Sequence, residues 1–257
     1  MLPMFIRAAS AAVTAFLAFV PKTAGVLAII LLCTLVGWED GLPSFIKTAL
    51  WVVAVLTMLL GNIGALLQTS TQRMLGYSSI AHSGYMLIGV IAGPPLGIVA
   101  VLVYLVIYGA TNTSAFATLA SLSRDGEPVD TLEDISGLHK RSPLAATSFA
   151  VSCGSLLGIP PLFGFWGKLL LFAAGIAAGQ LALVLVAAVA SAISAWYYLR
   201  LIGLSLLSPT TPRSESVRVT LLWPLIAAVI SAIIAIGGPL FLTSVVADAK
   251  QAIVESE

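Results

Sequence analysis

The chain has 257 residues, of which 59% are hydrophobic and only 9% are charged. Because soluble domains carry about 25% charged residues, this composition excludes a water-facing surface over most of the chain and predicts a polytopic membrane protein. The net charge of +1 gives no reason to expect a nucleic-acid partner. The two cysteines, Cys33 and Cys153, lie in apolar segments without metal-ligand spacing, so we expect small core side chains and no metal site.

Seven apolar segments are long enough to span a membrane, for which a helix needs about 20 residues. They are apolar all round rather than alternating, which favours helices over a membrane barrel. In chain order we predict helices at 11–36, 45–68, 74–93, 97–121, 143–178, 180–207 and 217–244. Together they predict a single membrane domain, an all-α bundle of about seven transmembrane helices.

The fifth segment is too long for one straight span and contains the stretch GIPPLFGFWGK near its middle. Five residues in this stretch disfavour a continuous helix: Gly158, Pro160, Pro161, Gly164 and Gly167. We therefore predict two half-helices, 143–158 and 162–178, with a break at 158–162. Irregular backbone at membrane depth is tolerated where it is buried in protein or lines a water-filled cavity.

Basic residues are distributed unequally between the two predicted sides of the membrane. The side that holds the N-terminus and the connections at 69–73, 122–142 and 208–216 carries Arg7, Arg73, Arg124, Lys140, Arg141, Arg200, Arg213 and Arg218. The opposite side carries only Lys47 and Lys250. The positive-inside rule then places the N-terminus inside, in the matrix or cytoplasm, and the C-terminus outside. We expect the 122–142 connection to be a solvated inner-face loop.

Two lysines lie deep within the predicted spans, whereas all eleven acidic residues lie in connections or tails. Lys22 follows Pro21 about eleven residues, or roughly 17 Å, into its helix, and a lysine near the midplane costs about 2.5–3.5 kcal/mol. Lys168 lies at a similar depth, directly after the predicted break. A mechanical kink accounts for the prolines but not for a lysine beside them, and broken helices form ion sites in transporters. We favour functional lysines over tolerated structural ones.

A third base, His82, lies on a polar stripe of the third predicted helix with Ser78, Ser79 and Tyr85. A neutral imidazole can both accept and donate a proton near neutral pH, although a lone histidine is often a satisfied core residue. We expect the bases and hydroxyl groups to support proton movement. Because the spans hold no carboxylate, the counter-charge would come from another chain or a bound anion.

Two further stripes follow the same spacing. The fourth predicted helix carries Tyr104, Tyr108 and Asn112, which we expect to support the His82 stripe. The sixth carries Ser191, Ser194 and Tyr198, which we interpret as ordinary helix–helix contacts.

Five stretches resemble, in order, the antiporter-like membrane subunits of complex I: AVTAFLAFVPKTAG, GNIGALLQTSTQRMLGYSSIAHSGYMLIG, ISGLHKRSPLAA, GIPPLFGFWGKLLLF and SAISAWYYLRLI. The most similar subfamily is NADH dehydrogenase subunit 2, called subunit N in bacteria, and the similarity spans about residues 11–205. It implies a family fold of fourteen helices with two inverted five-helix repeats, each containing a broken helix. This chain resembles helices eight to fourteen, the C-terminal half.

The resemblance implies a non-redox, proton-translocating subunit of respiratory NADH:quinone oxidoreductase. Lys22 matches the central lysine of the family's eighth helix, Lys168 the terminal-channel lysine of the broken twelfth helix, and His82 the histidine of the SSIAH motif. NADH, FMN, iron–sulfur clusters and ubiquinone would be bound by other subunits. This agrees with a sequence that has neither a glycine-rich nucleotide-binding turn nor a cysteine cluster.

The sequence departs from the family pattern at several places. Gln72 stands beside Arg73 where the family often has a lysine, and TNTSAFA replaces the commoner MNLGAFA. The carboxylate and lysine of the first repeat have no counterpart. We expect a separately encoded N-terminal half of subunit 2 as a partner, together with other membrane-arm subunits and lipids. We expect a mitochondrial inner membrane, with the N-terminus on the matrix side, or alternatively a bacterial plasma membrane.

Two other functions stay open. The chain could be a subunit of a multi-subunit cation/proton antiporter, for which we expect Na⁺- or K⁺-dependent transport without NADH oxidation. It could also be a structural fragment with an inactive channel.

Overall fold

The computed structural model describes residues 2–38 and 42–254, with side chains for most residues between 13 and 238. Its long helices are α1 (Leu2–Val36), α2 (Ser44–Leu66), α3 (Thr71–Ala92), α4 (Leu96–Ser121), α6 (Pro143–Leu157), α7 (Phe163–Ala177), α8 (Leu181–Leu206) and α10 (Leu222–Val254). The short elements are β1 (Leu122–Arg124), β2 (Glu127–Pro128), α5 (Leu138–Arg141), α9 (Pro212–Glu215) and β3 (Val217–Val219).

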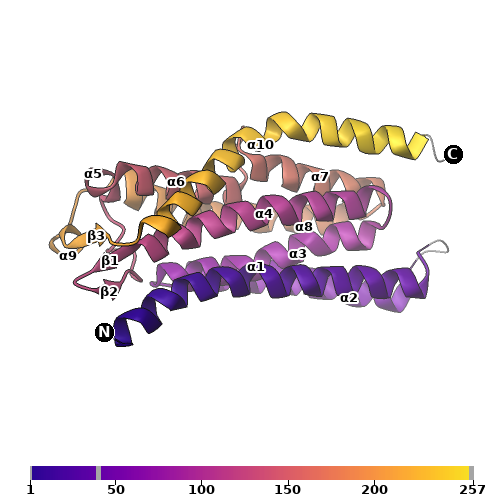
Figure 1. The fold of residues 1–257 in the computed structure, drawn as a ribbon. Coiled ribbons are helices and arrows are strands. Elements are labelled where there is room, and N and C mark those ends of the chain that lie inside the picture. Colours follow the sequence, from indigo (N-terminus) through magenta and orange to yellow (C-terminus); the bar gives the residue numbers. More distant parts are fainter. Residues whose placement is uncertain (1, 39–41, 255–257) are drawn as a thin grey trace.

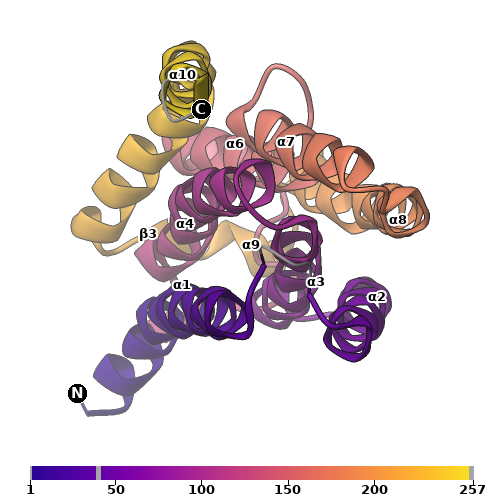
Figure 2. The same cartoon turned by 90° about the vertical axis from the view of Figure 1, so that its right-hand side faces the viewer.

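The long helices form one elongated bundle, with the short elements gathered at one end (Figure 1). Viewed along the bundle, α4 and α3 lie in the centre, and α1, α2, α8, α7, α6 and α10 surround them (Figure 2). Contacts between elements agree, since α4 packs against α1, α3, α6, α7 and α10, while α3 also packs against α2, α7 and α8. Polar groups carried by α3 and α4 are therefore shielded by the outer helices.

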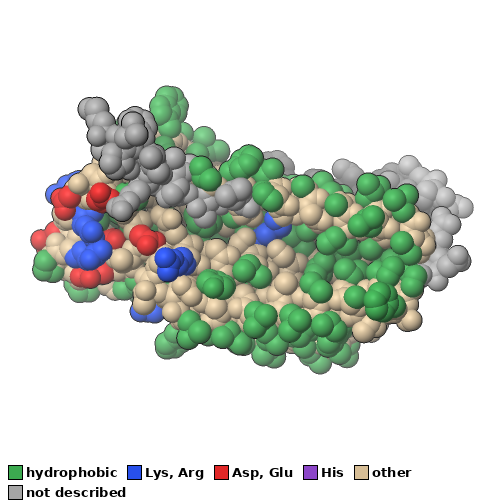
Figure 3. Space-filling model, turned by 90° about the horizontal axis from the view of Figure 1, so that it is seen from below, with side chains coloured by type: hydrophobic (Ala, Val, Ile, Leu, Met, Phe, Trp, Pro, Cys, Tyr) green, Lys and Arg blue, Asp and Glu red, His purple; other side chains and the backbone are tan. Residues whose placement is uncertain are grey.

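The surface and the helices confirm the predicted all-α polytopic membrane protein. Among the described residues, four helical stretches are long and apolar enough to cross a membrane: Ala18–Val36, Ser44–Leu66, Leu96–Ser121 and Leu181–Leu206. Three shorter apolar helical stretches are Pro143–Leu157, Phe163–Ala177 and Leu222–Gly238. Viewed from below, charged side chains gather at the end that holds the short elements, and apolar side chains cover most of the rest (Figure 3).

The third expected span, α3, is long enough to cross a membrane but is not among these apolar stretches. Its serines, histidine and tyrosines lower its hydropathy, and most of its residues are buried inside the bundle. Neighbouring helices rather than lipid therefore surround its polar side chains, as expected for polar groups at membrane depth.

Two expected helices have different ends in the structure. The first begins at Leu2 instead of residue 11, and the last runs over Leu222–Val254 instead of 217–244. Residues 217–219 form β3, which pairs antiparallel with β1. In this strand Val217 is buried and Arg218 is exposed, the alternation of a strand rather than of a helix.

The expected solvated loop at 122–142 is instead a folded unit, and the expectation was wrong for much of its length. Strands β1 and β2 form a hairpin whose two turn residues, Asp125 and Gly126, both have positive φ angles of 50° and 82°. An Asp-Gly pair is favoured in such a turn. Val129, Ile135 and Leu138 are buried in the main hydrophobic core, which docks this connection onto the helices.

Candidate functional site

Lys22 lies on α1 with its ammonium group directed at α3 and α4. Its Nζ donates hydrogen bonds to the carbonyl oxygen of Ser79 at 2.5 Å and to Ser79 Oγ at 2.7 Å. It also lies 3.8 Å from the centre of the Tyr108 ring, whose hydroxyl donates to Ser79 Oγ at 2.8 Å. Neutral oxygens and an aromatic face therefore solvate this cation.

Helix α1 continues through Pro21, one residue before the lysine. Proline has no backbone N–H, so one carbonyl in the preceding turn lacks its usual helical partner.

His82 is buried between three helices and uses both ring nitrogens. Nδ1 is 2.6 Å from the Tyr104 hydroxyl on α4, and Nε2 is 3.1 Å from the Tyr198 hydroxyl on α8. The Tyr198 hydroxyl also hydrogen-bonds with Ser78. A hydroxyl group can donate or accept, so this arrangement accommodates either neutral tautomer of the imidazole.

Lys168 lies on α7 directly after the break, and the break supplies its first hydrogen-bond partner. Its Nζ donates to the carbonyl oxygen of Leu157 at 2.8 Å and to Ser191 Oγ at 3.0 Å. Leu157 is the last residue of α6, where helix carbonyls lack intrahelical partners and the helix dipole is negative. Ending α6 inside the bundle thus creates an acceptor for the buried ammonium group.

The break between α6 and α7 lies where the sequence predicts it, between Leu157 and Phe163. Gly158 ends α6 in a left-handed conformation, with φ 93°. Its N–H bonds to the carbonyl oxygen of Gly154, as does that of Ile159, and this pattern closes a helix C-terminus. A Cβ at Gly158 would lie 3.2 Å from Lys168 Cδ. Pro160 and Pro161 lie between the two half-helices, where no helical hydrogen bond requires their missing N–H groups.

Gly164 and Gly167 lie inside α7 rather than in the break. A Cβ at Gly164 would lie 1.8 Å from the carbonyl oxygen of Ser155, and one at Gly167 would lie 2.7 Å from the Tyr104 ring. These two glycines allow α7 to approach α6 and α4 closely, which brings Lys168 into the bundle.

An aromatic row connects the two lysines through the histidine. The His82 ring centre lies 5.1 Å from that of Tyr108, which faces Lys22. On the other side it lies 5.7 Å from that of Tyr85, whose ring centre lies 5.0 Å from Lys168 Nζ. The structure therefore brings Lys22, His82 and Lys168 into one row with the predicted Ser78, Ser79, Tyr85 and Tyr108. In this row Lys22 is half-buried and the other six side chains are buried.

Asn112 is buried on α4, but no hydrogen bond joins it to this row, and its Nδ2 has no partner among the described residues. The Tyr85 hydroxyl faces Asn62 and Ser191 without a well-oriented hydrogen bond to either. Buried polar groups of this kind are commonly satisfied by ordered water. The Tyr85 hydroxyl is therefore a place where water could enter the row.

The polar stripe of α8 takes part in the site and does more than pack helices together. Ser191 and Tyr198, expected above as ordinary helix contacts, bind the row: Ser191 accepts a hydrogen bond from Lys168, and Tyr198 connects His82 to Ser78. A further buried pair was not predicted, in which the Tyr197 hydroxyl donates to Asn62 Oδ1 at 2.9 Å. Asn62 is an amide in an apolar span, and this was a signal that could have pointed to a buried partner.

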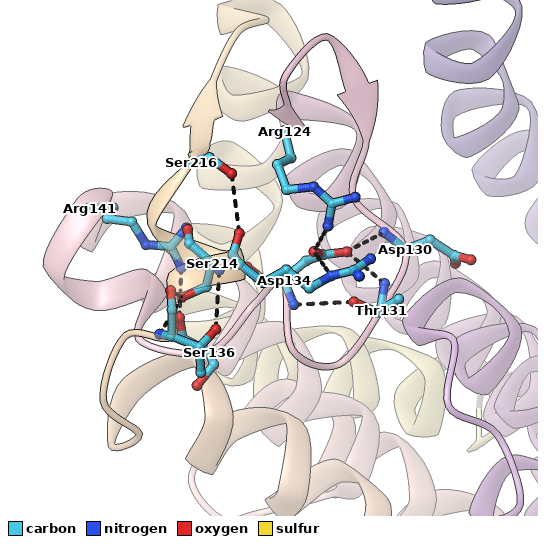
Figure 4. Close-up of polar contacts among 10 residues, drawn as sticks. Arg124, Asp130, Thr131, Asp134, Ser136, Arg141, Ser214 and Ser216 are labelled. Atoms are coloured by element: carbon cyan, nitrogen blue, oxygen red, sulfur yellow. Dashed lines mark hydrogen bonds and ion pairs between the residues drawn. The ribbon is translucent and has the colours of Figure 1, made fainter.

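A second polar cluster, the loop-end cluster of Arg124, Asp134, Arg141, Arg213 and Ser214, lies outside the predicted spans (Figure 4). Asp134 forms ion pairs with Arg124 and with Arg213, whose Nε is 2.9 Å from Oδ1. Its other carboxylate oxygen accepts from the backbone N–H of Thr131 at 3.0 Å. The cluster holds the 122–142 connection against the residues that precede β3.

These hydrogen bonds determine the direction in which the pKa of Asp134 is shifted. Burial by itself would raise the pKa of Asp134, but hydrogen bonds from Thr131, Arg213 and Asp130 outweigh it and hold the pKa below its ordinary value. Asp134 is therefore a permanent anion at neutral pH. The aromatic row, in contrast to this cluster, has no acidic side chain near it: every acidic side chain that the structure describes lies in the 122–142 connection or at Glu215.

The fold and the site together define a class. This is a helical polytopic membrane protein in which a buried lysine, Lys168, lies beside a broken helix, an arrangement that transporters use for ion sites. Residues 2–194 match the family described as NADH:quinone oxidoreductase/Mrp antiporter, TM. The chain belongs to this family.

Two curated relatives are close in sequence. "NADH-quinone oxidoreductase subunit N" of Desulfovibrio desulfuricans is 48% identical over 211 residues, which cover 77% of this chain and 40% of the relative. "NAD(P)H-quinone oxidoreductase subunit 2" of Picosynechococcus is 43% identical over 208 residues, covering 80% and 39%. The expected resemblance to complex I subunit N is confirmed. The chain spans only about 40% of the length of these relatives.

Solved structures share the fold. A chain of respiratory complex I from Thermus thermophilus is 35% identical, with a TM-score of 0.65 over 76% of this chain and 44% of that chain. A chain of the Mrp complex from Dietzia is 25% identical, with a TM-score of 0.68 over 77% and 46%.

Proposed function

We propose that this chain is part of a proton-translocating, non-redox subunit in the membrane arm of an NADH:quinone oxidoreductase. The observation that carries the proposal is the row from the half-buried Lys22 through the buried Tyr108, His82 and Tyr85 to the buried Lys168. Relatives in quinone oxidoreductases, 48% and 43% identical, support this setting.

The chemistry of the row suits proton movement. Both ammonium groups are held by carbonyl oxygens, hydroxyls and ring faces, with no carboxylate bonded to them among the described residues. A buried cation without a counter-ion is costly, so loss of its proton is comparatively easy. The hydroxyls around His82 can donate or accept in turn, and water at the Tyr85 hydroxyl would complete a path for protons.

In this proposal, quinone reduction takes place on other subunits, which bind NADH, FMN, the iron–sulfur clusters and ubiquinone. A carboxylate on a partner approaching Lys22 would favour its protonated form, and withdrawal would release the proton. The remainder of the antiporter-like unit, expected above as a separately encoded N-terminal half, would pack against this chain and lie close to α1. Exposed apolar side chains on α1, such as Leu31 and Leu35, are available for such packing.

We further propose a bacterial plasma membrane, because the relatives named above are bacterial, with the basic end of the bundle in the cytoplasm. This replaces the mitochondrial inner membrane as the favoured location.

The test uses the assembled complex in membrane vesicles, with a Lys168→Met variant that keeps the length of the side chain and removes its charge. We expect proton pumping driven by NADH oxidation to fall at least tenfold while the complex still assembles. The matched control is Lys140→Met, because Lys140 is an exposed lysine at the basic end, and its pumping should equal that of the unmodified complex.

Unchanged pumping and quinone reduction in Lys168→Met would favour a structural role. Transport of Na⁺ or K⁺ without NADH oxidation would instead assign the chain to an Mrp-type antiporter, the alternative kept open by the family description and the Dietzia structure.

A further inference from the structure

A partly open cavity of about 410 Å³ lies at the basic end of the bundle, away from the aromatic row. It is formed where α6 and α10 begin, with β3 and α5 beside it. Its lining includes Leu138, Leu144, Leu222 and Leu225 together with two guanidinium groups, Arg141 and Arg218. An apolar cavity whose lining also includes two cations differs from a dry structural void, because genuinely empty cavities are apolar.

Neither guanidinium forms an ion pair with a carboxylate among the described residues. Arg141 donates to the carbonyl oxygens of Ser214 and Ser136 (Figure 4), but its Nε is buried and lacks a partner in the described part of the chain. Arg218 is exposed and donates only to the carbonyl oxygens of Glu215 at 2.6 Å and Val217 at 3.1 Å. Arg141 Nη2 also donates to the carbonyl oxygen of Asp134 at 3.4 Å. The exposed donors left for a ligand are therefore those of Arg218, whereas the unpartnered Nε of Arg141 is buried.

The surrounding charges leave the cavity positive. Burial and the nearby Arg218 lower the pKa of Arg141, against the opposing effect of Asp134 and Glu215. Asp134 is already engaged by Arg124 and Arg213, so its charge is largely compensated. An arginine stays protonated even when its pKa is lowered. Among the described residues, two guanidinium groups with one nearby carboxylate outside these ion pairs, Glu215, leave a net positive charge that attracts an anion.

Two helix N-termini add to this attraction. Ser142, the residue before α6, makes no side-chain capping hydrogen bond, and the first turns of α6 and α10 contain no acidic residue. The unpaired N–H groups and positive dipole ends of helices favour phosphate groups.

The apolar walls restrict the kind of anion. Leu144 is 54% exposed, Leu222 is 67% exposed and Trp223, next along α10, is 82% exposed. Exposed leucines beside an exposed tryptophan are typical of the boundary between lipid headgroups and acyl chains. A free phosphate would satisfy the arginines but leave this apolar surface uncovered.

We propose that this cavity binds an anionic phospholipid, with its phosphate between Arg141, Arg218 and the start of α6. Its acyl chains lie along Leu144 and Leu222. A zwitterionic lipid has the same phosphate but carries a compensating cation, so the site selects a headgroup with net negative charge, such as phosphatidylglycerol. The bound lipid would also fasten β3 and α10 to the start of α6.

The experiment titrates phosphatidylglycerol, or phosphatidylcholine for comparison, into the delipidated complex and counts bound lipids by native mass spectrometry. Arg218→Gln is the main variant because Arg218 is exposed and, within the described chain, its side chain bonds only to the carbonyl oxygens of the nearby residues Glu215 and Val217. We expect its phosphatidylglycerol affinity to fall about fivefold, the effect of one basic charge near an anionic headgroup, with phosphatidylcholine affinity unchanged. The control is Arg200→Gln. It removes an exposed charge from the C-terminal part of α8, outside the cavity lining, and the variant should bind phosphatidylglycerol as before.

A second pair of measurements distinguishes a lipid site from a simple anion site and from a protein interface. Leu222→Ser should weaken phosphatidylglycerol binding, whereas inorganic phosphate should compete only weakly for the site. Equal competition by inorganic phosphate, with no effect of Leu222→Ser, would overturn the proposal in favour of a simple anion site. Loss of a co-purifying protein in Arg218→Gln, with lipid binding unchanged, would overturn it in favour of a protein interface.

Discussion

The aromatic row in the middle of the bundle and the loop-end cluster differ in the groups that stabilise their positive charges. In the row, the ammonium groups of Lys22 and Lys168 are held by carbonyls, hydroxyls and ring faces. In the loop-end cluster, Arg124 and Arg213 share the carboxylate of Asp134. A cation bound to neutral groups can lose its proton without leaving a buried anion behind, whereas an arginine–carboxylate pair stays ionised. The first arrangement suits transfer of charge, and the second suits a fixed joint.

The largest expected loss of stability comes from disturbing the close contact between α6 and α7, which positions Lys168 in the row. Gly164→Ala would place a Cβ 1.8 Å from the carbonyl oxygen of Ser155, and backbone on both sides leaves nothing flexible to move. We expect a loss of more than about 3 kcal/mol of stability, measured as thermal unfolding in detergent. The control is Gly203→Ala, because a Cβ at this helical position meets nothing within 4 Å, and it should leave stability equal or slightly higher. Equal melting temperatures for the two variants would contradict the close approach of α7 to α6.

The next largest effect comes from the loop-end cluster. Asp134→Asn leaves two guanidinium groups without their shared carboxylate, and we expect stability at neutral pH to fall by about 2–3 kcal/mol. Asp125→Asn makes the same charge change in the exposed turn of the hairpin, where asparagine tolerates the positive φ angle. Proteolysis of the 122–142 connection should accelerate in the first variant only. Similar protection in both would show that the ion pairs contribute nothing measurable.

The pH dependence of the same connection gives a smaller, graded effect. The pKa of Asp134 is lower in the folded protein than the unfolded value of about 3.9. The stabilisation is therefore fully present above pH 4 and is lost as the pH falls through the folded-state pKa. Protection of the connection from hydrogen exchange should decline in this acidic window. In Asp134→Asn that part of the pH profile should be flat, and a decline that persists unchanged would assign it to another group.

The smallest expected change in stability comes from substituting Tyr85, and it separates the role of its ring from that of its hydroxyl. Tyr85→Phe keeps the ring that faces Lys168 and removes a hydroxyl that makes no well-oriented hydrogen bond, so stability should change by less than about 0.5 kcal/mol. Tyr85→Leu also removes the aromatic face and should cost about 1–2 kcal/mol more. Vesicle pumping measured on both variants distinguishes a hydroxyl that carries protons from a ring that only holds the lysine. A larger loss of stability in Tyr85→Phe than in Tyr85→Leu would contradict this account of the contact.

Much of the site was visible in the sequence because its signals are local. Two consecutive prolines, Pro160 and Pro161, strongly disfavour a continuous helix, and a lysine in an apolar span is expensive in any membrane fold. The acceptor that the break provides, the carbonyl oxygen of Leu157, is eleven residues away from Lys168 and follows only from how α7 turns back against α6. Ser191 and Tyr198 could not be assigned, because serines and tyrosines at helical spacing serve equally well as packing residues.

The sequence by itself determined the membrane class, the approximate helices, the position of the break and the presence of two lysines within apolar segments. Apolar length, proline and glycine act within one or two helical turns, so they need no knowledge of neighbouring helices. Only the tertiary structure decided what surrounds each charge. Lys22 meets Ser79 57 residues away, His82 meets Tyr198 116 residues away, and Asp134 meets Arg213 79 residues away. Such pairings depend on which faces of distant helices and loops pack together, and residue spacing does not encode that choice.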